Sequence, residues 1–228
     1  MRVLLTTDVM GGVWSYTEEL TDALLARGHS VALVSLGGEP RSEHRAWLAE
    51  RPDVEFTALC YPLEWMPEPE PGLTASAGAL HAIVRRSAPD VIHLNQFFYG
   101  AVDFGVPKLV AAHSDVVSWW EAVKGEAPPD DEWFARYRRW VEAGLAGADA
   151  RVAPSAWMAG RVESIYRAGR VHTVHNARTP GPLVAAGRAE RDPLVVTVGR
   201  LWDEGKGARD LAAVAGRLAG VGRVVVSG

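Results

Sequence analysis

Two cations that follow a short apolar run are the residues of this sequence best suited to chemistry. In the stretch VTVGRLWDEGKG, Arg200 follows Gly199 directly and Lys206 comes later in a glycine-flanked loop. Two fixed cations beside the start of a helix suit a diphosphate, which carries negative charge on several oxygens. The alternative is a solvated loop in which Asp203 and Glu204 pair with these cations. The sequence leaves both interpretations open.

A pair of adjacent glycines forms a second pattern of this kind, in TTDVMGGVW. An apolar run ends near Asp8, and Gly11 and Gly12 come just before a helical pattern. Glycine permits positive φ and close approach of the backbone, and the N-terminus of a following helix attracts anions. The pattern is not the G-x-G-x-x-G of a dinucleotide fold, and a plain tight turn explains it equally well. It predicts either a phosphate-facing loop or a structural turn.

His113 ends the apolar run KLVAAH and is the candidate for catalysis. Asp115 lies close by in the sequence and could orient the imidazole or raise its basicity. A histidine at a strand end is also a common hydrogen-bonded structural residue. Asn95 and Gln96 follow the apolar run VIHL. Because ligands of open parallel sheets bind at the carboxyl ends of the strands, we expect Asn95 and His113 to reach the same edge.

Short apolar runs alternate with helical patterns along most of the chain. Continuous apolar strands indicate burial on both faces, and their alternation with helices is typical of a parallel sheet. We therefore expect an α/β fold with a doubly wound, mostly parallel sheet and helices on both faces. Ser15 and Glu18 match a capping box at the start of the first helix. The expected strands are 2–7, 31–36, 54–59, 91–94, 108–113, 151–153 and 171–174, and the expected helices are 15–27, 43–51, 73–87, 131–145 and 155–168.

The composition changes at 178–193, which is rich in proline, glycine and charge and is typical of a linker. We expect a Rossmann-like domain at 1–177 and the beginning of a second Rossmann-like domain at 194–228, with a strand at 194–198, a helix at 208–218 and a strand at 223–226. One strand–helix–strand unit cannot cover both faces of its sheet. The second domain is therefore expected to be incomplete, in a fragment or in a half-subunit that another chain completes.

Composition excludes several classes of protein. The sequence is 48% hydrophobic and 23% charged, which is typical of a globular domain, and its net charge of −4 gives no electrostatic reason to expect nucleic acid as a partner. The single cysteine, Cys60, excludes an internal disulfide framework and suits a reducing compartment; we expect it in the core. Neither a signal peptide nor an apolar segment of membrane-spanning length is recognisable. A cytoplasmic location is expected.

Tryptophans form two clusters. Trp119 and Trp120 fall in an expected long loop after His113, where their rings could stack on a sugar or pack beneath the loop. Further along, an aromatic face opposite three arginines could lie on a membrane surface, peripheral to its inner side. We favour the alternative that this face is the buried side of a helix. It consists of Trp133, Phe134, Tyr137 and Trp140.

The order of several segments resembles a known family. They are GGVWSYTEELTDALLARGHSVALVS, PDVIHLN, VAAHSD, ADARVAPSAWMAGRV, VHTVHNA and VVTVGRLWDEGKG. Together they resemble the GT-B glycosyltransferases, specifically the retaining family four, also called group 1. The resemblance implies that Gly11 and Gly12 lie against the donor phosphates and transferred sugar. It also implies that Arg200 and Lys206 grip the diphosphate and that His113 positions the transferred sugar.

The same resemblance implies the reaction and its partners. A sugar would move from a nucleotide-diphosphate sugar to a hydroxyl of a saccharide, a small glycoside or a lipid-linked acceptor, with retention of configuration. No cofactor is implied, and the sequence lacks an Asp-x-Asp-type metal pair. The N-terminal domain would hold the acceptor. Candidate acceptor or sugar contacts are Trp14, Asn95, Asp115, Trp119 and Trp120.

One departure from the family concerns its paired-glutamate donor motif, which does not occur in the 228 residues. We therefore expect this polypeptide alone to transfer sugar poorly, and to need a further C-terminal region or a partner chain. A GT-B sugar-nucleotide epimerase is the second hypothesis. It is less favoured, because Asp8 and Asp115 are the only acids at the expected strand ends. A non-catalytic half-subunit is the third.

Overall fold

The computed structural model describes residues 1–181, 193–218, 220 and 222–227. The chain divides into two compact units, one formed by Met1–Ser118 with Ala127–Thr179 and the other by Trp119–Glu126 with Pro180–Gly228. Of the linker expected at 178–193, residues 182–192 lie outside the described part. The two units are therefore considered separately.

A seven-stranded sheet with the order β3-β2-β1-β4-β5-β6-β7 forms the centre of the first unit. Each pairing in it is parallel. This confirms the expected α/β fold with a parallel sheet, since the runs of buried aliphatic residues are covered on both faces. The strands are β1 (Arg2–Asp8), β2 (Ser30–Leu36), β3 (Glu55–Ala58), β4 (Val91–Leu94), β5 (Lys108–Ala111), β6 (Ala150–Ala153) and β7 (His172–Thr173).

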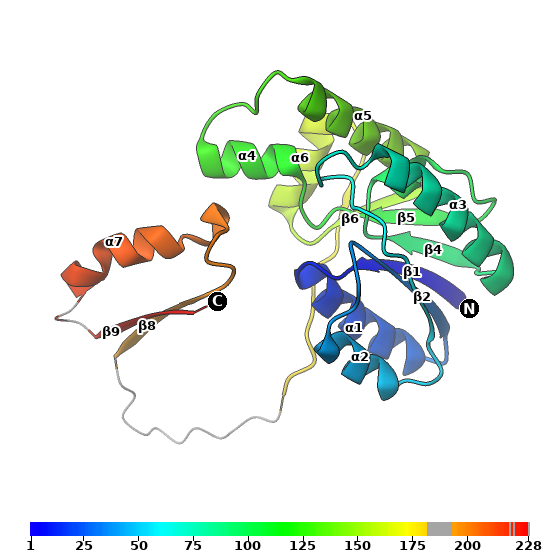
Figure 1. The fold of residues 1–228 in the computed structure, drawn as a ribbon, viewed down its shortest axis with the longest axis horizontal. Helices are drawn as coiled ribbons and strands as arrows, with labels where there is room; N and C mark the ends of the chain where they lie inside the picture. The colour runs from blue at the N-terminus through cyan, green and yellow to red at the C-terminus, as the bar shows by residue number, and fades with distance from the viewer. Residues whose placement is uncertain (182–192, 219, 221, 228) are drawn as a thin grey trace. The chain divides into compact units, whose positions relative to one another are not determined.

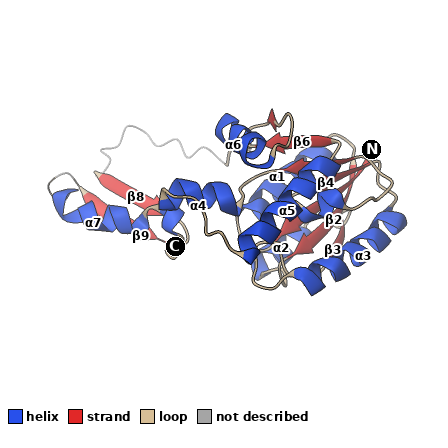
Figure 2. Ribbon diagram, turned by 90° about the horizontal axis from the view of Figure 1, so that it is seen from above, coloured by secondary structure: helices blue, strands red, loops and turns tan. Residues whose placement is uncertain are grey.

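The helices lie on both sides of this sheet. The strand order reverses between β1 and β4, and right-handed crossovers then place the helices before and after that point on opposite faces. Figure 1 shows α1 and α2 on one side and α3 and α5 on the other, and Figure 2 shows the helices packed over the strands. The helices are α1 (Gly12–Leu25), α2 (Ser42–Ala49), α3 (Glu70–Ser87), the 3-10 helix η1 (Phe98–Ala101), α4 (Val116–Lys124), α5 (Glu132–Gly147) and α6 (Ala156–Tyr166).

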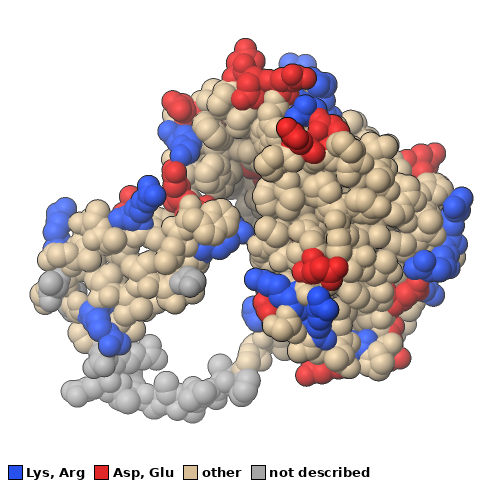
Figure 3. Space-filling view, in the orientation of Figure 1, with Lys and Arg blue, Asp and Glu red and all other residues tan. Residues whose placement is uncertain are grey.

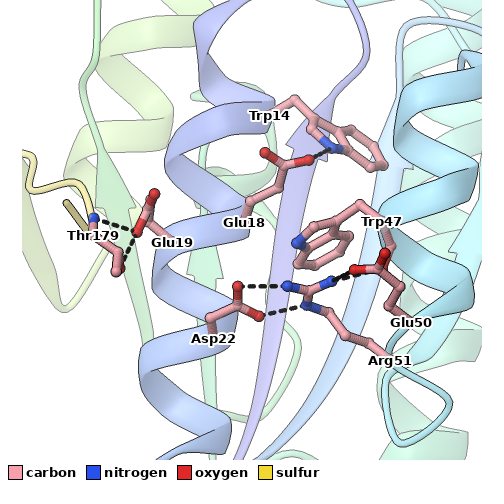
Figure 4. A network of polar contacts seen from close by, with 8 residues as sticks. All are labelled: Trp14, Glu18, Glu19, Asp22, Trp47, Glu50, Arg51 and Thr179. Carbon is pink, nitrogen blue, oxygen red and sulfur yellow. Dashed lines mark hydrogen bonds and ion pairs between the residues drawn. The ribbon is translucent and has the colours of Figure 1, made fainter. Parts of the chain in front are cut away.

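Helix α1 begins earlier than the sequence predicts. Gly11 is its N-cap and no side chain caps it, so the expected capping box of Ser15 and Glu18 is wrong. Glu18 instead accepts a hydrogen bond from the indole Nε1–H of Trp14 at 2.9 Å (Figure 4). The amides of the first turn therefore have no side-chain partner at the N-cap, in contrast to a helix that begins with serine or aspartate.

A charged contact joins α1 to the end of α2. Arg51 donates to both carboxylate oxygens of Asp22, at 2.5 and 2.8 Å, and its guanidinium lies 4.4 Å from the centre of the Trp47 ring (Figure 4). Beneath it, leucines of both helices pack on buried residues of β1 and β2, including Leu5 and Leu33. The cysteine expected in the core, Cys60, is exposed instead.

Backbone-to-backbone packing brings α5 against η1. A Cβ on Gly144 would lie 1.9 Å from the carbonyl oxygen of Phe97, and a Cβ on Gly100 would lie 2.2 Å from the carbonyl oxygen of Gly144. No side chain fits at either position, which explains glycine at both. This contact fixes the segment that follows β4, and that segment contributes to the site described below.

The second unit has the strand–helix–strand order that the sequence predicts. β8 (Leu194–Val198) pairs in parallel with β9 (Arg223–Ser227), and the elements between them are η2 (Glu204–Lys206) and α7 (Ala208–Leu218). Within the described residues, α7 has no buried side chain, and Val198 and Trp202 are 73% and 76% exposed.

Candidate active site

A small pocket opens at the carboxyl edge of the first unit's sheet, where the strand order reverses. Its volume is roughly 70 Å³. Reversal points of this kind are the usual ligand sites of open α/β sheets, because the flanking loops diverge there. The polar residues that line the pocket follow β1, β3, β4 and β5. They are Asp8, Glu64, Asn95, Gln96, His113 and Ser114.

His113 and Asn95 are hydrogen-bonded to each other across the ends of β4 and β5. His113 Nε2 lies 2.9 Å from Asn95 Oδ1, while Asn95 Nδ2 donates to the carbonyl oxygen of Thr6 at 2.6 Å. The contact with Thr6 fixes the orientation of the amide, so the oxygen faces the imidazole and His113 must donate from Nε2. The neutral ring then presents Nδ1 as an acceptor. The sequence predicts that both residues reach one edge of the sheet, and in the structure they are hydrogen-bonded there.

Burial keeps the His113 ring uncharged. Desolvation lowers the pKa of His113 to about 4, so the imidazole is neutral near pH 7. The Tyr16 ring meets it edge-on, with ring centres 4.4 Å apart, and the Tyr16 hydroxyl lies 3.3 Å from Nε2 of His93. Burial also lowers the pKa of His93 to about 4. Both imidazole rings are therefore neutral near pH 7 and are held by hydrogen bonds rather than by charge.

Asp115 does not orient His113, which corrects the sequence-based expectation. Its carboxylate is buried and accepts the backbone N–H groups of Val117 and Ser118, each at 3.0 Å, at the start of α4. It also accepts the hydroxyl of Tyr166 at 2.5 Å. A carboxylate satisfied in this way anchors α4 and α6. Asn95, which the sequence suggested only as a substrate contact, holds the imidazole instead.

Gly12 has open space beside it, and neither glycine of the Gly11–Gly12 pair needs a positive φ. Gly11 is extended with φ −166°, Gly12 is the first residue of α1, and neither adopts positive φ. The need for positive φ, one reason the sequence suggested for glycine, therefore does not apply. A Cβ on Gly12 would meet nothing within 4 Å. Close approach by a group outside the protein, next to the first-turn amides of α1, stays a prediction beside the alternative of a structural turn.

Two buried side chains of the pocket have polar atoms without a protein partner. Glu64 and Gln96 are each 3% exposed. Glu64 Oε1 accepts the backbone N–H of Phe97 at 2.9 Å, but within the described residues Oε2 and both amide atoms of Gln96 have no hydrogen-bond partner. Burial raises the pKa of Glu64 to about 7, with a smaller contribution from the charge of Asp8. Gln96 was expected at this edge because it follows the run VIHL. Glu64 was not expected there, because the loop that contains it, YPLEWMPEPE, carries no recognised motif.

The tryptophan predictions had mixed outcomes. Trp119 and Trp120 lie on helix α4, so the long loop expected there is wrong. Trp14 is 2% exposed and stacks on His44 with ring centres 3.9 Å apart, so it packs inside the protein. Contact of Trp14, Trp119 or Trp120 with an acceptor stays a prediction.

The aromatic face of α5 is buried at Phe134 and Tyr137, whereas Trp133 and Trp140 stay partly exposed. Phe134 and Tyr137 are 8% and 2% exposed, and Trp133 stacks on Tyr137 with ring centres 5.5 Å apart. Trp140 meets Phe98 of η1 edge-on at 6.0 Å. No helix of the described residues combines the length and apolar character required to cross a bilayer. Acidic and basic side chains are interspersed on the surface seen in Figure 3.

The two cations of the second unit differ in their surroundings. Arg200 donates to Asp203 at 2.8 Å and its guanidinium lies 5.0 Å from the centre of the Trp202 ring. Glu204 pairs with Lys124 at 2.6 Å, and Lys206 makes no ion pair with the described residues. Both acids that could have neutralised Lys206 are thus engaged elsewhere. Across the described part of the chain, no group of three or more His, Cys, Asp or Glu residues could hold a metal ion.

Comparison with known proteins agrees with this fold. A model of the family Glycosyltransferase Family 4 matches residues 10–180, which is most of the sequence, and the chain therefore belongs to glycosyltransferase family 4. No curated protein matches the sequence. Solved structures that resemble the chain are GT-B glycosyltransferases, and at the identities below the likeness shows the fold alone.

Three of these structures illustrate the match. The glycotransferase of kitacinnamycin has a TM-score of 0.60 and 14% identity, over 99% of this chain and 64% of that chain. The lipopolysaccharide outer core galactosyltransferase WaaB, in its apo form, has a TM-score of 0.59 and 11% identity, over 100% and 61%. UGT89C1 of Arabidopsis thaliana complexed with UDP-L-rhamnose has a TM-score of 0.58 and 16% identity, over 99% and 63%. The chain thus spans less than two thirds of each structure's length.

Proposed function

We propose that this chain forms the acceptor side and part of the donor side of a retaining glycosyltransferase that uses a nucleotide-diphosphate sugar. The observation that carries the proposal is the His113–Asn95 pair. It is a neutral, oriented imidazole in a pocket at the reversal point of the sheet, in a chain of glycosyltransferase family 4. A ring held in this way can accept a hydrogen bond from a sugar hydroxyl through Nδ1 without carrying charge into the site.

The reaction we propose breaks the bond between the anomeric carbon and the diphosphate oxygen. The acceptor oxygen forms the new bond to that carbon on the same face, and the departing oxygen keeps the electron pair. The proton of the acceptor hydroxyl passes to the departing phosphate, so the products are a glycoside and a nucleoside diphosphate. Negative charge grows on the diphosphate as the bond breaks, and fixed cations stabilise that charge most when they are already in place.

Arg200 and Lys206 are the proposed cations, and the Gly11–Gly12 loop the proposed backbone contact. Lys206 has no competing ion pair in the described structure, whereas Arg200 must exchange its contact with Asp203 for one with phosphate. The open space beside Gly12 suits a sugar phosphate approaching the first turn of α1. Because these groups supply the charge, we propose a reaction without a metal ion or other cofactor.

The family and the matched structures support the substrate class that we propose. UGT89C1 was solved with UDP-L-rhamnose, which supports a sugar nucleotide as the donor here. We propose a hydroxyl-bearing saccharide, glycoside or lipid-linked acceptor, and a cytoplasmic setting. The remaining donor contacts would come from further sequence or from a partner chain, since this chain covers less than two thirds of each reported structure.

A donor panel tests the proposal. The protein encoded by the complete reading frame and the 228-residue chain are each incubated with UDP-, GDP- and ADP-sugars and mixed acceptor glycosides. The nucleoside diphosphate that is released is then measured. We expect acceptor-dependent release by the complete protein and little by the 228-residue chain. A sugar nucleotide that is isomerised with no acceptor present would show an epimerase instead. If the complete protein neither releases nucleoside diphosphate nor isomerises any donor, the enzymatic proposal is wrong.

A further inference from the structure

Glu64 and Gln96 reach the same pocket from different parts of the chain. Glu64 lies on the segment between β3 and α3, and Gln96 follows β4 directly. The N–H of Phe97, next to Gln96, donates to Glu64, so one hydrogen bond ties the two segments together. The backbone contact of Gly144 with Phe97 holds this arrangement from the side of α5. The pair is therefore built into the fold rather than carried on a free loop.

Three polar atoms of this pair are buried and have no hydrogen-bond partner among the residues that the structure describes: Glu64 Oε2, Gln96 Oε1 and Gln96 Nε2. Leaving one such atom unsatisfied costs about 1–3 kcal/mol, so proteins rarely bury several together unless a ligand or water completes them. The amide of Gln96 offers both a donor and an acceptor, and Glu64 offers an acceptor or, when protonated, a donor. This mixture matches hydroxyl groups, each of which donates and accepts.

We propose, on the basis of the proposed function, that Glu64 and Gln96 form a subsite for a hydroxyl-bearing arm of a saccharide and so help select the substrate. The pocket volume of roughly 70 Å³ limits what enters. One water molecule needs about 10–15 Å³ of such volume, so the pocket has room for a hydroxymethyl group.

The arm could belong to the acceptor or to the transferred sugar, because both carry the same chemistry. Burial raises the pKa of Glu64 to about 7, so the carboxyl can be protonated near neutral pH. A buried carboxylate without partners is costly, whereas a protonated carboxyl can form a hydrogen bond with a neutral hydroxyl. Hydroxyl recognition by buried polar groups discriminates strongly, because a substrate that lacks the hydroxyl leaves those groups unpaired.

Gln96 offers a direct probe of this subsite. It is the only glutamine in the 228 residues, so glutamine side-chain ¹⁵N labelling gives one pair of amide signals. The labelled full chain is titrated with methyl β-D-glucopyranoside and methyl β-D-xylopyranoside, which differ only in the hydroxymethyl group. In separate arms it is titrated with UDP-glucose, GDP-mannose, UDP and GDP. These titrations need no turnover, so their outcome is independent of the donor panel.

A saturable shift of the Gln96 signals with the glucoside, weaker by at least about fivefold with the xyloside, would place the acceptor arm in the subsite. A shift with a sugar nucleotide but with neither its nucleoside diphosphate nor the glucoside would place the transferred sugar there. Signals that do not move saturably with any saccharide or sugar nucleotide overturn the proposal, and water then completes the pair.

Two variants test the part of Glu64. Glu64→Gln keeps an oxygen for the Phe97 amide and adds a second glutamine, so the Gln96 signals are assigned in it by comparison with the unmodified chain; we expect the Gln96 shift to remain within about twofold in affinity. Glu64→Met removes both carboxylate oxygens and should weaken the binding that shifts Gln96 by at least about fivefold. Glu126→Met, in an exposed segment, is the matched control. Equal binding by Glu64→Met and the unmodified chain overturns the shared subsite. If Glu64→Met does not fold, equal saturable shifts of the unmodified chain with the glucoside and the xyloside serve as the contrary result.

Discussion

His113 donates from Nε2 to the side-chain oxygen of Asn95 at 2.9 Å, and the same Asn95 amide is anchored to the carbonyl oxygen of Thr6. One asparagine thus sets both the tautomer and the direction of the imidazole. Histidines in active sites are often oriented by a carboxylate, which would favour the charged ring. An amide does so without adding charge, which agrees with the lowered pKa of His113.

Replacing Asn95 by aspartate should therefore change the protonation of His113. A carboxylate at 2.9 Å from Nε2 favours the imidazolium, and we expect the His113 pKa to rise by at least about one unit from its value of about 4. Titration of the histidine ring protons by NMR measures this. Asn176→Asp, at the other, exposed asparagine, is the control. An unchanged His113 titration would mean that the pair does not exist in solution.

Gly12→Ala should separate stability from function. A Cβ at Gly12 meets no protein atom within 4 Å, and alanine favours a helix by about 1 kcal/mol relative to glycine, so the variant should be at least as stable as the parent. If a sugar phosphate approaches this backbone, the added methyl group should reduce nucleoside diphosphate release by about tenfold or more in the complete protein.

The control for this experiment is Gly160→Ala, an exposed glycine of α6 that also has open space. The thermal unfolding midpoints of both variants should equal or exceed that of the parent, and turnover should fall only for Gly12→Ala. Normal turnover by Gly12→Ala would remove the glycine pair from the donor site and leave it a structural turn.

Much of the fold follows from the sequence because its signals are local. Runs such as RVLLTT and VALVSL are long enough and apolar enough to predict buried parallel strands, and all nine expected strands occur within a few residues of their predicted positions. The sequence did not predict helix α4, because the start of this helix depends on a cap by Asp115. The position of Asp115 in the sequence fits equally well a cap of α4 and a carboxylate that orients His113.

The site was predicted less completely, for a related reason. Strand ends identify His113, Asn95 and Gln96, since topology brings them to one edge. Glu64 comes from a connecting segment, and its burial depends on the backbone contact of Gly144 with Phe97, which joins residues far apart in the sequence. Contacts of this kind leave no periodic pattern, so only the structure reveals them.

Glu19 anchors the end of the first unit. It accepts the backbone N–H of Thr179 at 2.9 Å and the hydroxyl of Thr179 at 2.8 Å (Figure 4), and these hydrogen bonds lower its pKa. Glu19→Ala should free the chain at Thr179 and speed tryptic cleavage after Arg178 by roughly threefold, the range expected for an exposed charged contact. Mass spectrometry of the timed digest identifies that cut. Glu142→Ala, exposed on α5, is the control. Equal rates of cleavage after Arg178 in Glu19→Ala and the parent would show that Glu19 does not restrain the chain at Thr179.

Stability should depend on pH through Glu64. Its pKa rises from 4.5 to about 7 on folding, so between these values the folded state holds a proton that the unfolded state has lost. The folded state is therefore penalised increasingly as the pH rises from 4.5 to 7, by about 3 kcal/mol in total. His93 and His113, whose pKa values are lowered, have the opposite effect on acidification. Glu64→Gln removes only the Glu64 contribution.

Urea unfolding at pH 4.5 and 7.5 measures this difference. The difference between Glu64→Gln and the parent should shift in favour of the variant by about 3 kcal/mol on going to the higher pH, because the histidine contributions cancel in the comparison. Glu126→Gln, at an exposed site, should show no such shift. A difference between Glu64→Gln and parent that stays constant with pH would mean that the Glu64 carboxyl is solvated in the folded protein. The buried Glu64 carboxyl on which the saccharide subsite depends would then not exist in solution.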